Sequence, residues 1–286
     1  MADALAALSA DVAQLVAQAS PRLVTVTGAD GAVATGMIWR TGLVVAAHEA
    51  LGGEEEFSVT LADGSRKLAE AAGRDPSTDV ALFRVETSEL GDWPQAATPA
   101  VGSLAVVVGR GEHSATAGLA AVSEVGPAWR SMRGGAIDAR ITLGIWLTSR
   151  SEGGAVLAPD GSLIGMAVVG PRRRTLVIPA STVGRAVATL AAKGYMPRGY
   201  LGVSLHQLGD EGGAIIVGLE EKGPAQQAGL LVGDIITTWG ESPIRSVADI
   251  THRLSAESVG HAVKLGVLRG GSPLHLDIAV GERPRA

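Results

Sequence analysis

Hydrophobic positions follow a helical period only at the start of the chain. There, apolar residues recur at spacings of three and four at Leu5, Leu8, Val12 and Leu15. This spacing places them on one face and predicts a single amphipathic helix over residues 1–20. Pro21 predicts the end of that helix, because the residue before a proline is pushed out of helical geometry.

Short β-like runs separated by turns follow, up to about residue 180. They cover residues 23–27, 33–39, 43–47, 57–61, 80–85, 104–109, 118–123, 137–141, 155–158, 163–169 and 175–178. The pairs Asp63-Gly64 and Asp160-Gly161 supply turn chemistry between neighbouring runs. So many short strands at nearly regular spacing predict a β-barrel or sandwich over residues 21–180.

The last third of the chain is organised differently. Ser181 as N-cap and Gly194 as a stop predict a linker helix within residues 181–197. Pro224 predicts a one-turn helix at 225–228, and Ser246 with Asp249 predicts a capping box for a helix that runs to residue 256. Strands are expected at 200–205, 213–217, 234–239, 263–268 and 274–280. Together these elements predict a small mixed domain over 198–282, followed by a tail at 283–286.

Composition limits the function classes. With 24 Lys and Arg against 29 Asp and Glu, the net charge is −5, which argues against a nucleic-acid partner held by a large basic surface. The absence of cysteine excludes disulfides, thiol catalysis and Cys-ligated zinc, and nothing indicates a cofactor. No apolar stretch approaches the roughly 18 residues that cross a bilayer. Asp3 and Asp11 make residues 1–20 unlike a signal peptide, so the chain is cytoplasmic as written and periplasmic if a leader was removed.

Four segments resemble those of a known protein family. Residues 43–48 (LVVAAH) end in His48, and residues 74–82 (RDPSTDVAL) contain Asp79. Further on are residues 199–203 (GYLGV) and 223–236 (GPAQQAGLLVGDII). These stretches resemble the HtrA/Deg family of trypsin-like proteases that carry a C-terminal PDZ domain, over about residues 12–280. The resemblance implies a mostly β fold, with a trypsin-like double β-barrel followed by an α+β PDZ domain. It also implies that His48 is the catalytic histidine and Asp79 the aspartate that orients it.

The nucleophile segment departs from the family pattern. The family has Gly-Asn-Ser-Gly-Gly-Pro, whereas residues 150–155 of this chain are RSEGGA. Aligning the two glycines places Glu152 at the nucleophile position and Ser151 one residue too early. In the oxyanion loop, which here includes Arg150 and Gly153, Arg150 replaces the glycine whose N–H helps to bind the oxyanion. An arginine is less free than glycine to adopt the required backbone angles.

These changes predict a protein that has lost serine catalysis. Attack requires a hydroxyl within hydrogen-bond reach of the histidine, and a carboxylate attack by Glu152 would give an anhydride instead. We therefore expect a pseudoprotease with a relic triad of His48, Asp79 and Glu152. One alternative is an ATP-independent serine endopeptidase that uses Ser151. Two further hypotheses concern the triad: His48 held as imidazolium between the two carboxylates, or a metal ion held by all three side chains.

The PDZ domain is the expected recognition element. The resemblance implies that the loop of Tyr200, Leu201, Gly202 and Val203 binds the terminal carboxylate of a peptide, which adds as a strand. Ile250 and Leu254 on the following helix are expected to accept the terminal side chain. The partners would be proteins or peptide C-termini, with the chain acting as scaffold, regulator or holdase. Family members often form trimers through aromatic residues in the N-terminal segment; residues 1–20 contain none, so the oligomeric state stays open.

Other conspicuous side chains receive structural interpretations. Trp129 and Trp146 fall in segments that correspond to the family's activation and specificity loops, and we expect both to be packing residues in an aromatic-poor core. Arg172, Arg173 and Arg174 form a short basic run that we interpret as a solvated loop.

Overall fold

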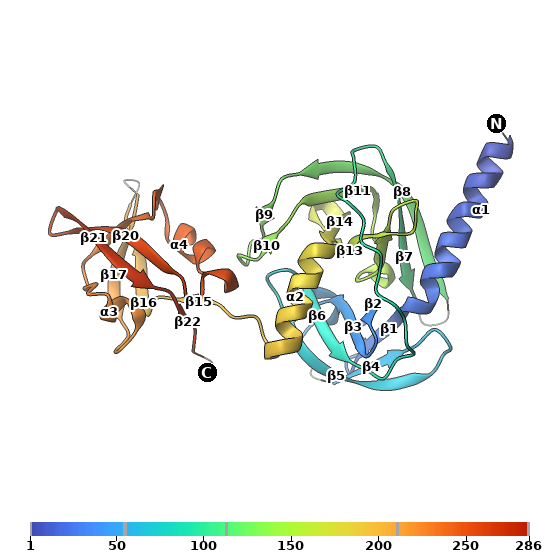
Figure 1. Ribbon diagram of the computed structural model, residues 1–286, viewed down its shortest axis with the longest axis horizontal. Coiled ribbons are helices and arrows are strands. Elements are labelled where there is room, and N and C mark those ends of the chain that lie inside the picture. The colour runs from blue at the N-terminus through green and yellow to red at the C-terminus, as the bar shows by residue number, and fades with distance from the viewer. Residues whose placement is uncertain (1, 54–55, 112–113, 210–211, 285–286) are drawn as a thin grey trace. The chain divides into compact units, whose positions relative to one another are not determined.

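The computed structural model describes residues 2–53, 56–111, 114–209 and 212–284. Met1 of the expected N-terminal helix and residues 285–286 of the expected tail lie outside this part. The chain forms two compact units, residues 1–131 with 136–196 and residues 132–135 with 197–286. The expected fold class is confirmed: the chain is mostly β, with a double barrel and a C-terminal PDZ domain (Figure 1).

The first unit begins with helix α1 (Ala2–Ala19) and continues with a closed six-stranded barrel in the order β1-β2-β3-β6-β5-β4. Its strands are β1 (Leu23–Gly28), β2 (Val33–Arg40), β3 (Leu43–Ala47), β4 (Phe57–Thr60), β5 (Arg66–Asp75) and β6 (Val80–Arg84). The sequence pattern did not predict β5. Most of its side chains are exposed or half-buried, and it contains neither β-branched nor aromatic residues.

A second closed barrel follows in the order β11-β14-β13-β12-β7-β8. Its strands are β7 (Leu104–Arg110), β8 (Ala115–Gly126), β11 (Arg140–Trp146), β12 (Ala155–Leu157), β13 (Leu163–Val169) and β14 (Arg174–Pro179). Strands β9 (Trp129–Arg130) and β10 (Ala136–Ile137) form a separate ribbon. One hydrophobic cluster joins residues of both barrels, so the barrels share a core and hold the loops between them in fixed positions.

Helix α2 (Ala180–Lys193) packs its apolar face into this shared core. The expected N-cap was wrong: Pro179 occupies that position without a side-chain cap, and the Ser181 hydroxyl instead donates to the Asp138 carboxylate. Gly194 ends the helix as predicted, in the left-handed conformation with a φ of 76°. None of the helices in the described ranges is long and apolar enough to cross a membrane.

The PDZ unit is built on a sheet in the order β16-β17-β18-β20-β21, where β19 also pairs with β18. The strands of this sheet are β16 (Val203–Gln207), β17 (Ala214–Leu219), β18 (Ile235–Trp239), β19 (Ser242–Pro243), β20 (Ala262–Arg269) and β21 (Ser272–Ala279). The short strands β15 (Gly199–Tyr200) and β22 (Gly281–Glu282) pair with each other. Helix α3 (Pro224–Gln227) begins at the expected proline, and the predicted capping box of Ser246 and Asp249 is present on α4 (Val247–Arg253). That helix ends at Arg253, three residues before the expected position, and a 3-10 turn over Ala256–Ser258 follows.

Candidate functional site

His48 and Asp79 are brought together by two short segments of the first barrel. His48 directly follows β3. Asp79 ends a turn organised by the buried Asp75, whose carboxylate accepts hydrogen bonds from Ser77 N (2.9 Å) and Thr78 Oγ1 (2.5 Å). The backbone N–H of His48 donates to the carbonyl of Asp79 at 3.2 Å, and the Asp79 carboxylate accepts from the N–H of Glu49 at 2.7 Å. The turn therefore fixes Asp79 beside the histidine that the resemblance assigns to catalysis.

Thr35 of β2 holds the segment that carries Glu152. Its backbone N–H donates to the carbonyl of Glu152 at 2.9 Å, and its hydroxyl donates to the carbonyl of Arg150 at 2.6 Å. Gly153 has a φ of 85°, and a Cβ there would lie 2.1 Å from the Thr35 carbonyl and 3.0 Å from the Ala47 N–H. Since Ala47 precedes His48, this close approach brings the nucleophile segment next to the histidine.

Ser151 does not direct its hydroxyl toward His48. Its Oγ exchanges hydrogen bonds with Thr116 Oγ1 at 3.0 Å and Thr148 Oγ1 at 3.1 Å. The side chain is buried, with 9% of the residue exposed. Sequence reasoning missed both threonines, because nothing in the local pattern marks either as a partner of Ser151. Thr116 is also 35 positions away. Ser151 thus ties its turn to β8 in this structure.

Glu152, which the glycine pair aligns with the nucleophile, is half-buried. Its carboxylate makes a long contact, 3.5 Å, with the backbone N–H of Val169 at the end of β13. Burial raises the pKa of the Glu152 carboxyl above its usual range, and the nearby charge of Glu49 raises it further. The Val169 N–H and the charge of Arg173 act in the opposite direction and lower that pKa. A partly dehydrated acid therefore occupies the position that the sequence alignment assigns to the nucleophile.

The oxyanion loop contains one short helical turn. Residues Ser149–Ser151 form a 3-10 helix in which the N–H of Ser151 donates to the carbonyl of Thr148 at 2.9 Å. The N–H of Gly153 donates to the carbonyl of Ala167 at 2.8 Å. The N–H groups of Ser151 and Gly153 are thus paired inside the protein, whereas the resemblance assigns oxyanion binding to the N–H groups of Arg150 and Glu152.

The metal hypothesis for His48, Asp79 and Glu152 gains no support. In the part of the chain that the structure describes, no three His, Asp or Glu side chains are grouped so that they could hold an ion.

The PDZ loop connects β15 to β16, and β16 is the edge strand of its sheet. The carbonyl of Leu201 accepts from the N–H of Ala225 at 2.8 Å, and the carbonyl of Gly202 accepts from the N–H of Glu220 at 2.9 Å. Gly202 has a φ of 72°, which a residue with a side chain adopts only with strain. Tyr200 is half-buried, Leu201 is buried and Val203 begins the edge strand.

Helix α4 packs beside this edge strand. The side chain of Gln207, the last residue of β16, donates to the carbonyl of Arg245 at 3.0 Å and accepts from the N–H of Val247 at 2.9 Å. Ile250 belongs to the domain core, with 1% of its surface exposed. Leu254 is partly buried against the same core.

One of the two expected packing tryptophans does not pack. Trp129 is half-buried, and its indole N–H donates to the carbonyl of Ala139 at 3.3 Å. Trp146 at the end of β11 is 77% exposed, so the expectation of a core residue was wrong there. Arg172, Arg173 and Arg174 are all exposed, as a solvated loop requires.

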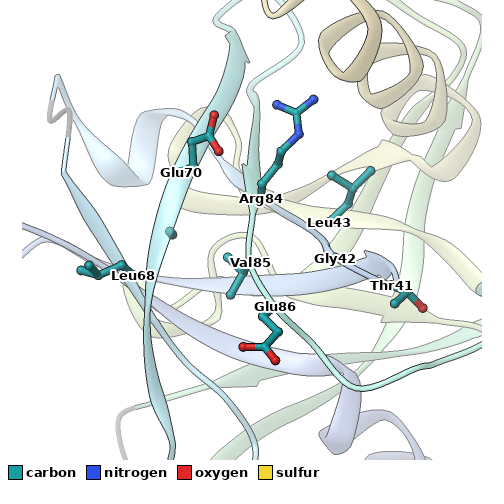
Figure 2. Close-up of a pocket in the computed structure, with 9 residues that line it drawn as sticks. Thr41, Gly42, Leu43, Leu68, Glu70, Arg84, Val85 and Glu86 are labelled. Atoms are coloured by element: carbon teal, nitrogen blue, oxygen red, sulfur yellow. The ribbon is translucent and has the colours of Figure 1, made fainter.

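A shallow depression of about 600 Å³ lies on the outer wall of the first barrel, apart from these residues. Figure 2 shows Glu70 of β5 and Arg84 of β6, which are register partners on neighbouring strands, and the exposed Leu68 further along β5. The lining of this depression contains none of the catalytic residues that the resemblance assigns.

Comparisons with known proteins agree with this architecture. Residues 34–166 match the model of the trypsin-like peptidase domain, and residues 199–280 match that of the PDZ domain. The chain is 29% identical over 277 residues to a probable periplasmic serine endoprotease DegP-like of Pseudomonas fulva, with 87% of this chain and 55% of the relative covered. A protein of the same name from Bartonella henselae is 27% identical over 273 residues, with coverage of 85% and 52%. The chain thus spans about half the length of the curated relatives it matches.

Solved structures show the same fold. A serine endoprotease from Yersinia pestis superposes with a TM-score of 0.74 at 22% identity, covering 96% of this chain and 98% of that one. The HtrA-type protease AlgW with decapeptide gives a TM-score of 0.74 at 20% identity, with coverage of 96% and 99%. The chain therefore carries a segment that matches the trypsin-like peptidase domain, followed by one that matches the PDZ domain, and it is similar to serine endoproteases of the DegP-like and HtrA types.

Proposed function

We propose that this chain recognises peptide or protein C-termini through its PDZ domain, and that its trypsin-like domain does not cleave by serine attack. The observation that carries the second half is the position of Ser151, whose hydroxyl is bonded to Thr116 and Thr148. Glu152 at the nucleophile position has no hydroxyl to offer. The chain would then act as a scaffold, regulator or holdase for the proteins it binds.

The edge strand β16 supports peptide recognition. Its outer side has no strand partner in the sheet, so an extended peptide can add there through main-chain hydrogen bonds. The left-handed Gly202 opens the loop before it, where backbone N–H groups can meet a terminal carboxylate. One structural relative, AlgW, was solved with a decapeptide.

A second candidate function is an ATP-independent serine endopeptidase that uses Ser151. The curated relatives favour this reading over the first, because they are named serine endoproteases. It requires the Ser151 hydroxyl to leave Thr116 and Thr148 and reach His48. It also requires the N–H groups of Arg150 and Glu152, in and after the 3-10 turn at Ser149–Ser151, to face a developing oxyanion.

Peptide binding is tested with fluorescein-labelled decapeptides that end in valine and carry either a free carboxylate or an amide. We expect the carboxylate form to bind the full chain at least tenfold more tightly. Gly202→Ala should weaken that binding, because a side chain at positive φ strains the carboxylate loop. Gly240→Ala is the matched control: it also has positive φ, 59°, but a Cβ there meets no atom within 4 Å.

Equal affinity for the carboxylate and amide peptides would contradict recognition of C-termini. Equal loss of binding in both glycine variants would show that backbone strain in the domain, and not the loop, controls the affinity.

A further inference from the structure

Trp146 and the arginine turn that follows β13 form one exposed surface on the second barrel. Trp146 lies directly opposite Arg174 in the pairing of β11 with β14. Residues directly opposite each other in an antiparallel pair project from the same face of the sheet. The hydroxyl of Thr175 donates to the carbonyl of Ile145 at 3.1 Å, which ties the two strand ends together. The side chains of Trp146 and Arg174 therefore project from the same face of the second barrel.

The turn itself holds its arginines outward. Arg172 and Arg173 have φ values of 58° and 59°, a left-handed conformation that costs about 1–3 kcal/mol for a residue with a side chain. Two backbone hydrogen bonds fix the turn: Gly170 N–H to the Arg174 carbonyl at 2.8 Å, and Arg173 N–H to the Gly170 carbonyl at 3.1 Å. Every residue from 171 to 174 is exposed.

The charges of this turn are largely unneutralised. Within the described ranges, Arg172 and Arg174 make no salt bridge and no side-chain hydrogen bond. Of the three arginines, Arg173 is the one whose charge lowers the pKa of Glu152. A local excess of positive charge thus stands on a chain whose net charge is −5.

We propose that Trp146 with Arg172, Arg173 and Arg174, the arginine–tryptophan surface, binds an acidic peptide segment. Arginine forks pair with carboxylates, and the indole of Trp146, a residue that is 77% exposed, offers a face to an apolar or aromatic side chain. This proposal rests on the proposed function, since it gives the non-cleaving domain a peptide-recognition role of its own. It adds an internal acidic sequence to the C-terminus that the PDZ domain would bind.

The charge count favours a peptide over other anionic partners. Nucleic-acid binding draws on many phosphate contacts, about 6–10 in well-studied proteins, and three arginines on an acidic chain supply too few. The charge of Glu152 also acts on Arg173, so a continuous layer of anionic headgroups over the three arginines would be repelled by it. A peptide can space its carboxylates between the arginines and avoid that repulsion.

The test uses a fluorescein-labelled, C-terminally amidated decapeptide of alternating glutamate and leucine, with a glutamine-for-glutamate peptide as its partner control. The amide removes the carboxylate on which the PDZ domain depends. We expect the full chain to bind the glutamate peptide, and Arg172→Gln with Arg174→Gln to weaken that binding about tenfold or more. The charge-matched control is Arg40→Gln with Lys264→Gln, both exposed on strands β2 and β20. Trp146→Phe should remove the change in tryptophan fluorescence that accompanies binding.

Equal binding of the glutamate and glutamine peptides, or equal weakening in the two double variants, would overturn the proposal. The surface would be assigned to membranes instead if the unmodified chain binds phosphatidylserine vesicles and the double variant Arg172→Gln with Arg174→Gln loses this binding but keeps its affinity for the peptide. The decapeptide with a free carboxylate should bind the arginine variant normally. Its failure to bind the unmodified chain would count against the proposed PDZ function alone.

Discussion

Replacing Ser151 with alanine separates a structural role from a catalytic one. The substitution removes the hydroxyl that bonds to Thr116 and Thr148 and leaves the backbone turn in place. Each such hydrogen bond contributes a net of about 0.5–1.5 kcal/mol. Thr116 is half-buried and Thr148 exposed, so water can replace part of the loss at both. We therefore expect Ser151→Ala to lower the free energy of unfolding by about 1–2 kcal/mol.

Calorimetry of the full chain measures this effect. For a unit of about 190 residues, 1 kcal/mol corresponds to roughly 2–4 °C in Tm, so the transition of the double barrel should fall by about 2–8 °C. The PDZ transition should not move, and any background hydrolysis of casein should stay the same. A Tm that does not change, together with loss of a measurable protease activity, would refute the reasoning and identify Ser151 as the nucleophile.

Three further substitutions probe the same architecture. Burial raises the pKa of Glu152 in the folded protein above its ordinary 4.5, so the protein loses stability as the pH rises through that pKa and the carboxyl becomes charged. In urea titrations, Glu152→Gln should be more stable than the parent near pH 7 and as stable as the parent below pH 4. Gly153→Ala should cost about 3 kcal/mol by the same titrations, since its Cβ would overlap the Thr35 carbonyl; Gly31→Ala, with a φ of 86° and open space, should cost only about 1 kcal/mol. Asp234→Asn should destabilise the PDZ unit by about 2 kcal/mol, because Asp234 is 1% exposed and bonded twice to Arg269. The pKa of Asp234 is lowered by Arg269, so in the parent this contribution is present at neutral pH and disappears as pH falls below about 4.

The elements that sequence predicts well are those whose signal is local. The capping box of Ser246 and Asp249, the left-handed Gly194 and the alternating strands all depend on residues a few positions apart. Strand β5 carries charged and small residues, and it forms because closing the barrel between β4 and β6 supplies its pairing. Ser181 resembles an N-cap in sequence, but its hydroxyl is taken by Asp138, 43 residues away.

The residues of the candidate site also differ in how local their sequence signal is. Its histidine and aspartate lie in contiguous motifs, so the sequence places His48 and Asp79, and the glycine pair aligns Glu152 with the nucleophile. The partners of Ser151 and the exposure of Trp146 depend on how distant strands meet. A hydroxyl direction and a solvent-exposed indole have no signature in the local sequence, which is why Trp146 was expected in the core.

The proposed function requires that Ser151 is not poised for attack. It is tested most directly by treating the intact protein with a fluorophosphonate probe and locating any adduct by mass spectrometry of tryptic peptides. The account predicts no adduct on Ser151, and none after denaturation and refolding. A stoichiometric adduct on Ser151 that disappears in His48→Ala would contradict the claim and establish the endopeptidase reading.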